Sequence, residues 1–363
     1  MIPPIRLPSL TLGDLTLPIA IIQGGMGVAI SMAGLAAAVA NEGGAGIIAT
    51  PGIGYRETDR LANYREANIR ALRKEIRLAR SKTQGILGVN IMSALSNYED
   101  MARTAMEEGI DLVISGAGLP MNLPAYRPDG CRSKLIPIVS SGRAATIITR
   151  RWMERFHCLP DAIIVEGPLA GGHLGFKPEQ ISDPAFALEH LVADVLDVTR
   201  KLEDKHQRPI PVLAAGGIYT GADIRRFFER GAAGVQMATR FVTTIECDAS
   251  DAFKQTYLDA TPNDLMIINS PVGLPGRAIR NQFLVDVEKG EKKPFVCHFH
   301  CIITCDMVNS PYCIAHALLN ARRGNLAHGF AFAGANAWRA QRIVTVRQVF
   351  EELQEEYRAS APV

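Results

Sequence analysis

The chain has 363 residues, 47% of them hydrophobic, which is enough for one large core with an appendage or for two ordinary domains. Its 39 basic and 37 acidic side chains leave a formal net charge of +2, and no long Lys/Arg block is present, so nucleic acid is not expected as a partner. The odd cysteine count of 7 and the lack of a signal-peptide pattern favour the reducing cytoplasm over a disulfide scaffold.

Residues 15–41 carry no charge and are long enough to cross a bilayer. Pro18 and the cluster of Gln23 with Gly24, Gly25 and Gly27 interrupt this stretch. We therefore expect a short strand, a tight loop and a helix over about 31–42, and no membrane partner.

Farther along the chain, short apolar runs alternate with longer amphipathic segments, which is typical of a parallel sheet built from strand–helix–strand units. Strands are expected at 19–23, 45–49, 86–92, 112–115, 135–139, 162–166, 212–215 and 234–238, with helix-like segments between them, including 58–81 and 221–232. Eight such strands predict an α/β fold of the TIM (β/α)8 barrel type. The count favours the barrel over an open doubly wound sheet made of the same units.

Glycines follow the carboxyl ends of the expected strands: Gly24, Gly25, Gly116, Gly118, Gly167, Gly171, Gly172, Gly216 and Gly217. In a barrel these loops share one face, where active sites are built. The sequence therefore predicts the functional site on that face.

The pattern changes after about Glu246. Residues 1–245 are expected to form the cofactor-binding barrel. Residues 246–313 show no strand pattern and are expected to form a smaller, mainly helical lid domain inserted after strand eight. Residues 314–363 are expected to form helices that pack back on the barrel.

The segment PVLAAGGIYTGADI runs from a buried strand through Gly216 and Gly217 into a helix that begins near Gly221. Free backbone N–H groups and a positive helix end would point to one place, which is the geometry of an anion site. After the next strand, Thr239 and Arg240 can add a hydroxyl group and backbone amides. Because the loops after strands seven and eight commonly bind phosphate in barrels, we expect a phosphate-bearing ligand here.

Six motifs occur along most of the chain: IIQGGMG, GVNIM, EGPLAGGHLGF, AAGGI, GVQMATRF and SPVGLPGRAI. Together they resemble the nitronate monooxygenase family, also called 2-nitropropane dioxygenases, whose relatives include flavin-dependent enoyl-acyl-carrier-protein reductases. The resemblance implies an oxidoreductase with a TIM barrel that binds FMN without a covalent link.

The resemblance also implies the cofactor-binding residues. The FMN phosphate would lie at Gly216, Gly217, Gln236, Ala238 and Thr239. The backbone of Gly24, Gly25 and Met26 would approach the ring, Asn90 would hydrogen-bond its polar edge, and Glu166, Gly171, Gly172 and Ala215 complete the set. An Asn side chain offers the donor and acceptor that this edge requires, although Asn90 could instead cap a local turn.

His173 lies in the glycine-rich motif after strand six. With an ordinary pKa of about 6.5, a histidine can take or give a proton at neutral pH. The matching histidine of the resembled family is the active-site one, so His173 is our candidate catalytic residue. Glu166 is either a second acid/base group or a cap on the glycine turn, and the cap is slightly favoured.

Cys297, Cys301 and Cys305 recur every four residues, and Cys313 follows eight later. On a helix the first three would form a sulfur-lined stripe. The spacing is not the CxxC of zinc ribbons or common ferredoxins, and the family resemblance does not explain it. Buried apolar thiols are favoured over an iron–sulfur or zinc site, and no residue is assigned to a metal.

Three functions remain open, each with a small-molecule substrate. The favoured one is oxidation of an alkyl nitronate by O2 to a carbonyl compound and nitrite, with His173 as base or orienting group. The second is NAD(P)H-dependent reduction of an enoyl thioester. The third is a non-redox phosphate-binding barrel enzyme without flavin. A homodimer is left open.

Overall fold

A computed structural model of the chain describes residues 6–297 and 299–361. Its central feature is an eight-stranded parallel sheet made of β3 (Ile21–Gln23), β4 (Gly46–Ala49), β5 (Leu87–Met92), β6 (Leu112–Gly116), β7 (Lys134–Val139), β8 (Ile163–Glu166), β10 (Val212–Ala215) and β11 (Gly234–Met237). The strands pair in the order β3-β11-β10-β8-β7-β6-β5-β4, and a parallel bridge from Ile22 to Ala45 links the two edge strands. The sheet is therefore a nearly closed TIM-like barrel. All eight predicted strands are confirmed.

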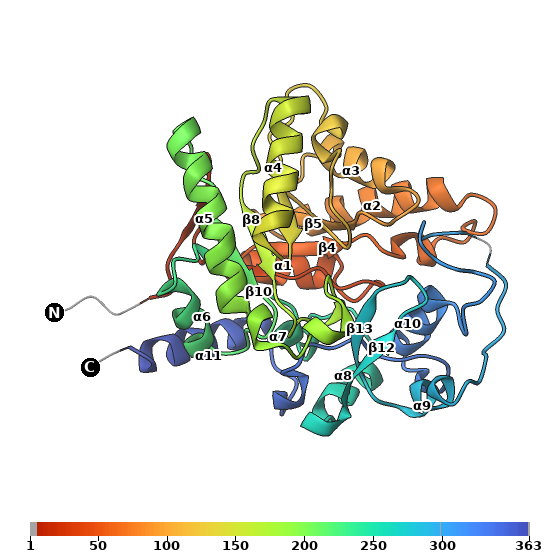
Figure 1. The fold of residues 1–363 in the computed structure, drawn as a ribbon. Helices are drawn as coiled ribbons and strands as arrows, with labels where there is room; N and C mark the ends of the chain where they lie inside the picture. Colours follow the sequence, from red (N-terminus) through yellow and green to blue (C-terminus); the bar gives the residue numbers. More distant parts are fainter. Residues whose placement is uncertain (1–5, 298, 362–363) are drawn as a thin grey trace.

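Helices surround this sheet (Figure 1). They are α1 (Ala33–Asn41), α2 (Tyr64–Arg80), α3 (Tyr98–Glu107), α4 (Gly142–Phe156), α5 (Leu188–His206), α6 (Gly221–Phe228), α7 (Thr239–Val242) and α11 (Val346–Ala359). The arginine-rich α2 buries an apolar face that includes Leu72 and Ile76. Its exposed face forms ion pairs with α3, including Arg77 with Glu108 at 2.7 Å.

Successive strand residues alternate between two cores, as the pleat of a β-strand requires. The inner core fills the barrel with residues such as Ile22, Ile114 and Ile164. Their sequence neighbours, such as Val113 and Val165, face the helices. This alternation decides which strand residues can reach a site at the barrel's mouth.

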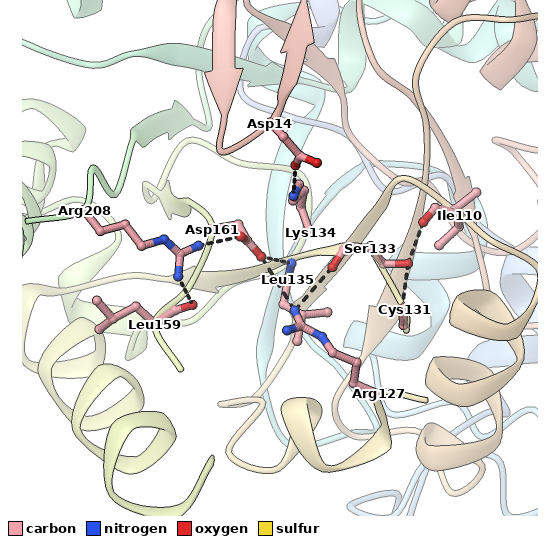
Figure 2. A network of polar contacts seen from close by, with 10 residues as sticks. All are labelled: Asp14, Ile110, Arg127, Cys131, Ser133, Lys134, Leu135, Leu159, Asp161 and Arg208. Atoms are coloured by element: carbon pink, nitrogen blue, oxygen red, sulfur yellow. Dashed lines mark hydrogen bonds and ion pairs between the residues drawn. The ribbon is translucent and has the colours of Figure 1, made fainter. Parts of the chain in front are cut away.

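The opposite end of the barrel is closed by a hairpin of β1 (Leu10–Leu12) and β2 (Leu15–Leu17), whose leucines belong to the inner core. Asp14 in its turn pairs with Lys134 at the start of β7. Figure 2 shows Asp161 nearby, which accepts from the Leu135 amide at 2.8 Å and from Arg208 at 2.6 Å. These contacts fix the amino ends of β7 and β8, and in barrels this end generally serves stability.

The segment after β11 differs from the sequence-based interpretation. It contains α8 (Asp251–Leu258), β12 (Leu265–Asn269), β13 (Pro275–Ile279) and α9 (Gln282–Glu288), and α10 (Ile314–Arg322) follows. The expectation of a segment without strands was wrong. The two strands pair with each other, and β13 also pairs with β9 (Gly172–His173) of the glycine-rich loop. The sequence hides β12 because Ile267, on its exposed face, is as apolar as buried Met266 and Ile268.

Within the described residues, no helix is long and apolar enough to span a membrane. The charge-free stretch 15–41 contains β2, β3 and α1, in agreement with the predicted strand, loop and helix.

Candidate active site

One pocket at the carboxyl ends of the barrel strands brings together all fourteen residues predicted for the site. They are Gly24, Gly25, Met26, Asn90, Glu166, Gly171, Gly172, His173, Ala215, Gly216, Gly217, Gln236, Ala238 and Thr239. The barrel geometry places them together although they come from segments more than 200 residues apart. Their individual roles stay predictions.

Strand alternation explains why three polar side chains reach this pocket. Glu166 lies two residues after the inward-facing Ile164 of β8. Asn90 and Gln236 occupy positions on β5 and β11 whose neighbours, such as Val89 and Val235, pack outward against the helices. The last inward layer of the barrel is thus polar and lines the pocket.

The loop after β10 offers unpaired backbone donors. Gly216 and Gly217 have positive φ values of 92° and 85°, and a Cβ atom on Gly216 would lie 2.8 Å from the Gly167 carbonyl oxygen. Only glycine is readily accommodated there. In the described part of the chain, the amides of Gly216, Gly217 and Thr239 have no hydrogen-bond partner. These three amides can bind an anion.

The start of α6 was predicted as part of the same anion site, but two of its backbone amides already donate to groups of the protein. The Gly221 amide donates to Glu356 Oε2 at 2.7 Å, and the Asp223 amide donates to Thr220 Oγ1 at 3.2 Å. The Gly221 and Asp223 amides are therefore not available to an anion. The capping box formed by Thr220 and Asp223 competes for the helix amides, so the loop glycines and Thr239 remain as donors.

Gly25 and Asn90 form the opposite wall. A Cβ atom on Gly25 would lie 2.3 Å from the Cβ of Asn90, so a side chain cannot be accommodated at Gly25. The Asn90 side chain has no hydrogen bond to any described residue, whereas its backbone carbonyl accepts from the Thr50 amide at 3.0 Å and from the Thr50 hydroxyl at 3.1 Å. Asn90 does not cap a turn, so its amide group is free to bind a ligand.

His173 is held by the segment after the barrel. In β9, His173 pairs with Gly276 of β13, and the His173 Nε2 atom lies 2.8 Å from the Ser270 hydroxyl oxygen. The ring packs edge-on against Phe332 at 5.0 Å between centroids. The motif SPVGLPGRAI, noted in the sequence without a role, supplies both Ser270 and β13.

Burial changes the acid–base chemistry predicted for this site. It lowers the pKa of His173 to about 4 and raises the pKa of Glu166 to about 7, since in each case the charged form loses hydration. The expected neutral-pH titration of His173 was therefore wrong. The Glu166 carboxylate has no hydrogen-bond or ion-pair partner among the described residues, so it does not cap the turn. Glu166 is the group that titrates near neutral pH.

Sequence reasoning missed the residues that fix the glycine-rich loop. Arg277 is buried, and its guanidinium donates to the carbonyl oxygens of Pro168 and Ala170, at 2.5 and 2.9 Å. The segment at Gly334 also lines the pocket, where its amide donates to Thr239 Oγ1 at 3.2 Å. The run of small residues AGANA was the available signal for this close approach.

The chain is similar to known proteins over most of its length. The family profile described as Nitronate monooxygenase matches residues 11–356, nearly the whole chain. The chain belongs to the nitronate monooxygenase family. Members of this family are generally flavin-dependent oxidoreductases.

Two curated relatives that are similar to this chain carry different names. A probable nitronate monooxygenase from Staphylococcus saprophyticus is 30% identical over 195 residues, covering 53% of this chain and 50% of the relative. The (3aS,4S,5R,7aS)-5-hydroxy-7a-methyl-1-oxo-octahydro-1H-indene-4-carboxyl-CoA dehydrogenase of Mycobacterium tuberculosis is 29% identical over 205 residues, covering 56% and 51%. The chain spans about half the length of these relatives.

Solved structures match over nearly the full length. FabK from Thermotoga maritima superposes with a TM-score of 0.72 and 29% identity, covering 94% of this chain and 93% of FabK. A nitroalkane oxidase from Streptomyces ansochromogenes has a TM-score of 0.72 at 21% identity, covering 95% and 97%, which shows a common fold.

The remaining part of the pocket is apolar. Its lining there includes Met92 and Leu95 from the barrel, Ile302 from the segment after it, and Ile314 and Leu318 from α10. An alkyl or acyl chain can lie against such a wall, next to the polar groups at the strand ends.

Proposed function

We propose that the protein binds FMN without a covalent link and oxidises alkyl nitronates with O2 to a carbonyl compound and nitrite. The observation that carries this proposal is the arrangement of unpaired polar groups in one pocket. Free amides of Gly216, Gly217 and Thr239 lie at one part, and the free side chain of Asn90 lies at another. Family membership supports a flavin as the ligand.

The donor set fits FMN. The three free amides would hold its phosphate, and the Asn90 amide offers a donor and an acceptor to the polar edge of the ring. The Gln236 Oε1 atom is buried without a partner and would accept a hydrogen bond from the cofactor. Bound FMN would supply the electron acceptor that amino-acid side chains lack.

His173 and Glu166 would divide the remaining work. A nitronate is already deprotonated, so its oxidation needs no strong base. The neutral imidazole of His173, fixed by Ser270, would orient the substrate through hydrogen bonds. Glu166, with a pKa raised by burial to about 7, would exchange a proton with a neutral nitroalkane or with the product.

A second candidate is reduction of an enoyl thioester with NAD(P)H. It is favoured by the match to FabK at 29% identity over 94% of the chain and by the apolar part of the pocket, which suits an acyl chain. In that reaction Glu166 or His173 would deliver a proton to the substrate carbon.

Two measurements test these proposals. Mass spectrometry of the cofactor released by denaturation should give FMN. FAD would contradict the phosphate placement at Gly216, Gly217 and Thr239, and a colourless protein without flavin would favour the non-redox barrel enzyme. Anaerobic stopped flow should then show faster flavin bleaching by an alkyl nitronate than by NADH. The reverse order would replace nitronate oxidation with the reductase.

A further inference from the structure

Four of the 7 cysteines fall within residues 297–313, a segment in which the described residues form neither helix nor regular strand. The predicted helical stripe of sulfur atoms is therefore absent from this part of the structure. The chain instead turns back on itself: the Cys305 amide donates to the Ile302 carbonyl at 3.2 Å, and an isolated bridge joins Ile302 to Leu95. This turn brings cysteines from separate parts of the segment together.

Packing places two of these thiols on one small apolar cluster. Cys301 and Cys313 both pack against the cluster that contains Val28, Tyr55 and Leu319. Cys313 also precedes α10, where its carbonyl accepts from the Ala317 amide at 3.0 Å, so the start of that helix fixes its position.

The four thiols also lie close enough to affect one another electrostatically, in every pairwise combination. Cys301 interacts with each of the other three, Cys305 with Cys297 and Cys313, and Cys313 with Cys297. All four are free thiols. Cysteines bind metal as thiolates, and several thiols in one place are the usual starting point for a metal centre.

A single metal ion and an iron–sulfur cluster require different distances between their ligand sulfur atoms. A tetrahedral zinc site places each sulfur about 2.3 Å from the metal, so the sulfur atoms are about 3.8 Å apart. Among residues 6–297 and 299–361, no group of three or more His, Cys, Asp or Glu is arranged to hold one ion. A four-iron cluster separates its ligands farther because each thiolate binds a different iron atom.

We propose that Cys297, Cys301, Cys305 and Cys313 bind a four-iron, four-sulfur cluster. The ligand set is four thiolates, the usual set for such a cluster. The site adjoins the barrel pocket through Cys301, which lines it, whereas Cys297, Cys305 and Cys313 do not. The proposal does not depend on the identity of the substrate.

The test is the iron, acid-labile sulfide and zinc content of full-length protein produced with added iron and purified without oxygen. About four iron and four sulfide per chain are expected for the wild type. Cys305→Ser and Cys313→Ser should each lose most of both, and Cys158→Ser should keep them. Cys158 is a matched control because it is a partly buried free thiol far from the segment, and burial also raises its pKa.

Circular dichroism and flavin content, expected to be unchanged in all variants, separate loss of the cluster from loss of the fold. Wild-type protein without iron, one zinc per chain in place of iron, or iron retained equally in both ligand variants and the control would each overturn the cluster. Iron and sulfide in a protein without flavin would support the cluster while contradicting the proposed function.

Discussion

Replacing Glu166 by Gln should stabilise the protein at pH 8 and leave its stability nearly unchanged at pH 4.5. Burial raises the pKa of this carboxyl group from 4.5 to about 7 in the folded protein. Between these two values the folded chain keeps a proton that the unfolded chain has released. Raising the pH through this interval therefore lowers the free energy of unfolding of the wild type, and the full loss is reached above pH 7.

The interval corresponds to at most about 3.5 kcal/mol, at about 1.4 kcal/mol per pH unit. It is an upper limit because Glu166 faces the pocket and keeps part of its hydration. Gln has a similar size and cannot ionise, so Glu166→Gln should avoid this loss. Partly buried His173 contributes with the opposite sign, since its contribution to the free energy of unfolding falls as the pH drops from 6.5 toward about 4. This contribution is present in both proteins and cancels in the difference.

The assay is urea unfolding followed by circular dichroism at pH 4.5, 6 and 8, with flavin removed from both proteins. Glu179→Gln is the matched control because Glu179 lies in the same loop region and is exposed. A stability difference between Glu166→Gln and the wild type that does not grow with pH, or that equals that of the control, would refute the assigned burial of the charge.

Three further predictions concern the same pocket. His173→Asn should retain flavin but lose about 10- to 100-fold in turnover of the preformed nitronate and of the neutral nitroalkane alike, because the imidazole orients both through a hydrogen bond, and wild-type turnover of both substrates by the variant would show that the imidazole has no role. Ser270→Ala removes the hydroxyl 2.8 Å from His173 Nε2 and should lower kcat about fivefold, corresponding to about 1 kcal/mol, without changing the flavin content. Gly25→Ala introduces a Cβ atom 2.3 Å from that of Asn90 and should abolish flavin retention in gel filtration, and normal retention would contradict the close approach at this wall.

The sequence by itself determined the barrel and the membership of its pocket. Strands such as β8 and β10 are continuous apolar runs because parallel strands are buried on both faces, and this pattern is visible locally. The glycines after them are also local, since a positive φ at Gly216 and Gly217 is set by the chain's own turn. Once the strands close into a barrel, all strand ends meet on one face, so the glycines after them share one pocket, and the resemblance to the family implied the other site residues.

The tertiary structure decided the chemistry of those residues. The pKa values of His173 and Glu166 depend on how much water surrounding chains exclude, and the Ser270 partner of His173 lies 97 residues away. The sequence could not show that the Gly221 amide of α6 donates to Glu356, which leaves the amides of Gly216, Gly217 and Thr239 as the free ones. Likewise, the four-residue spacing of the cysteines would give a stripe on a helix, whereas the described residues of this segment form no helix. Local patterns encode periodicity and backbone conformation, but desolvation and partner choice arise from contacts between distant segments.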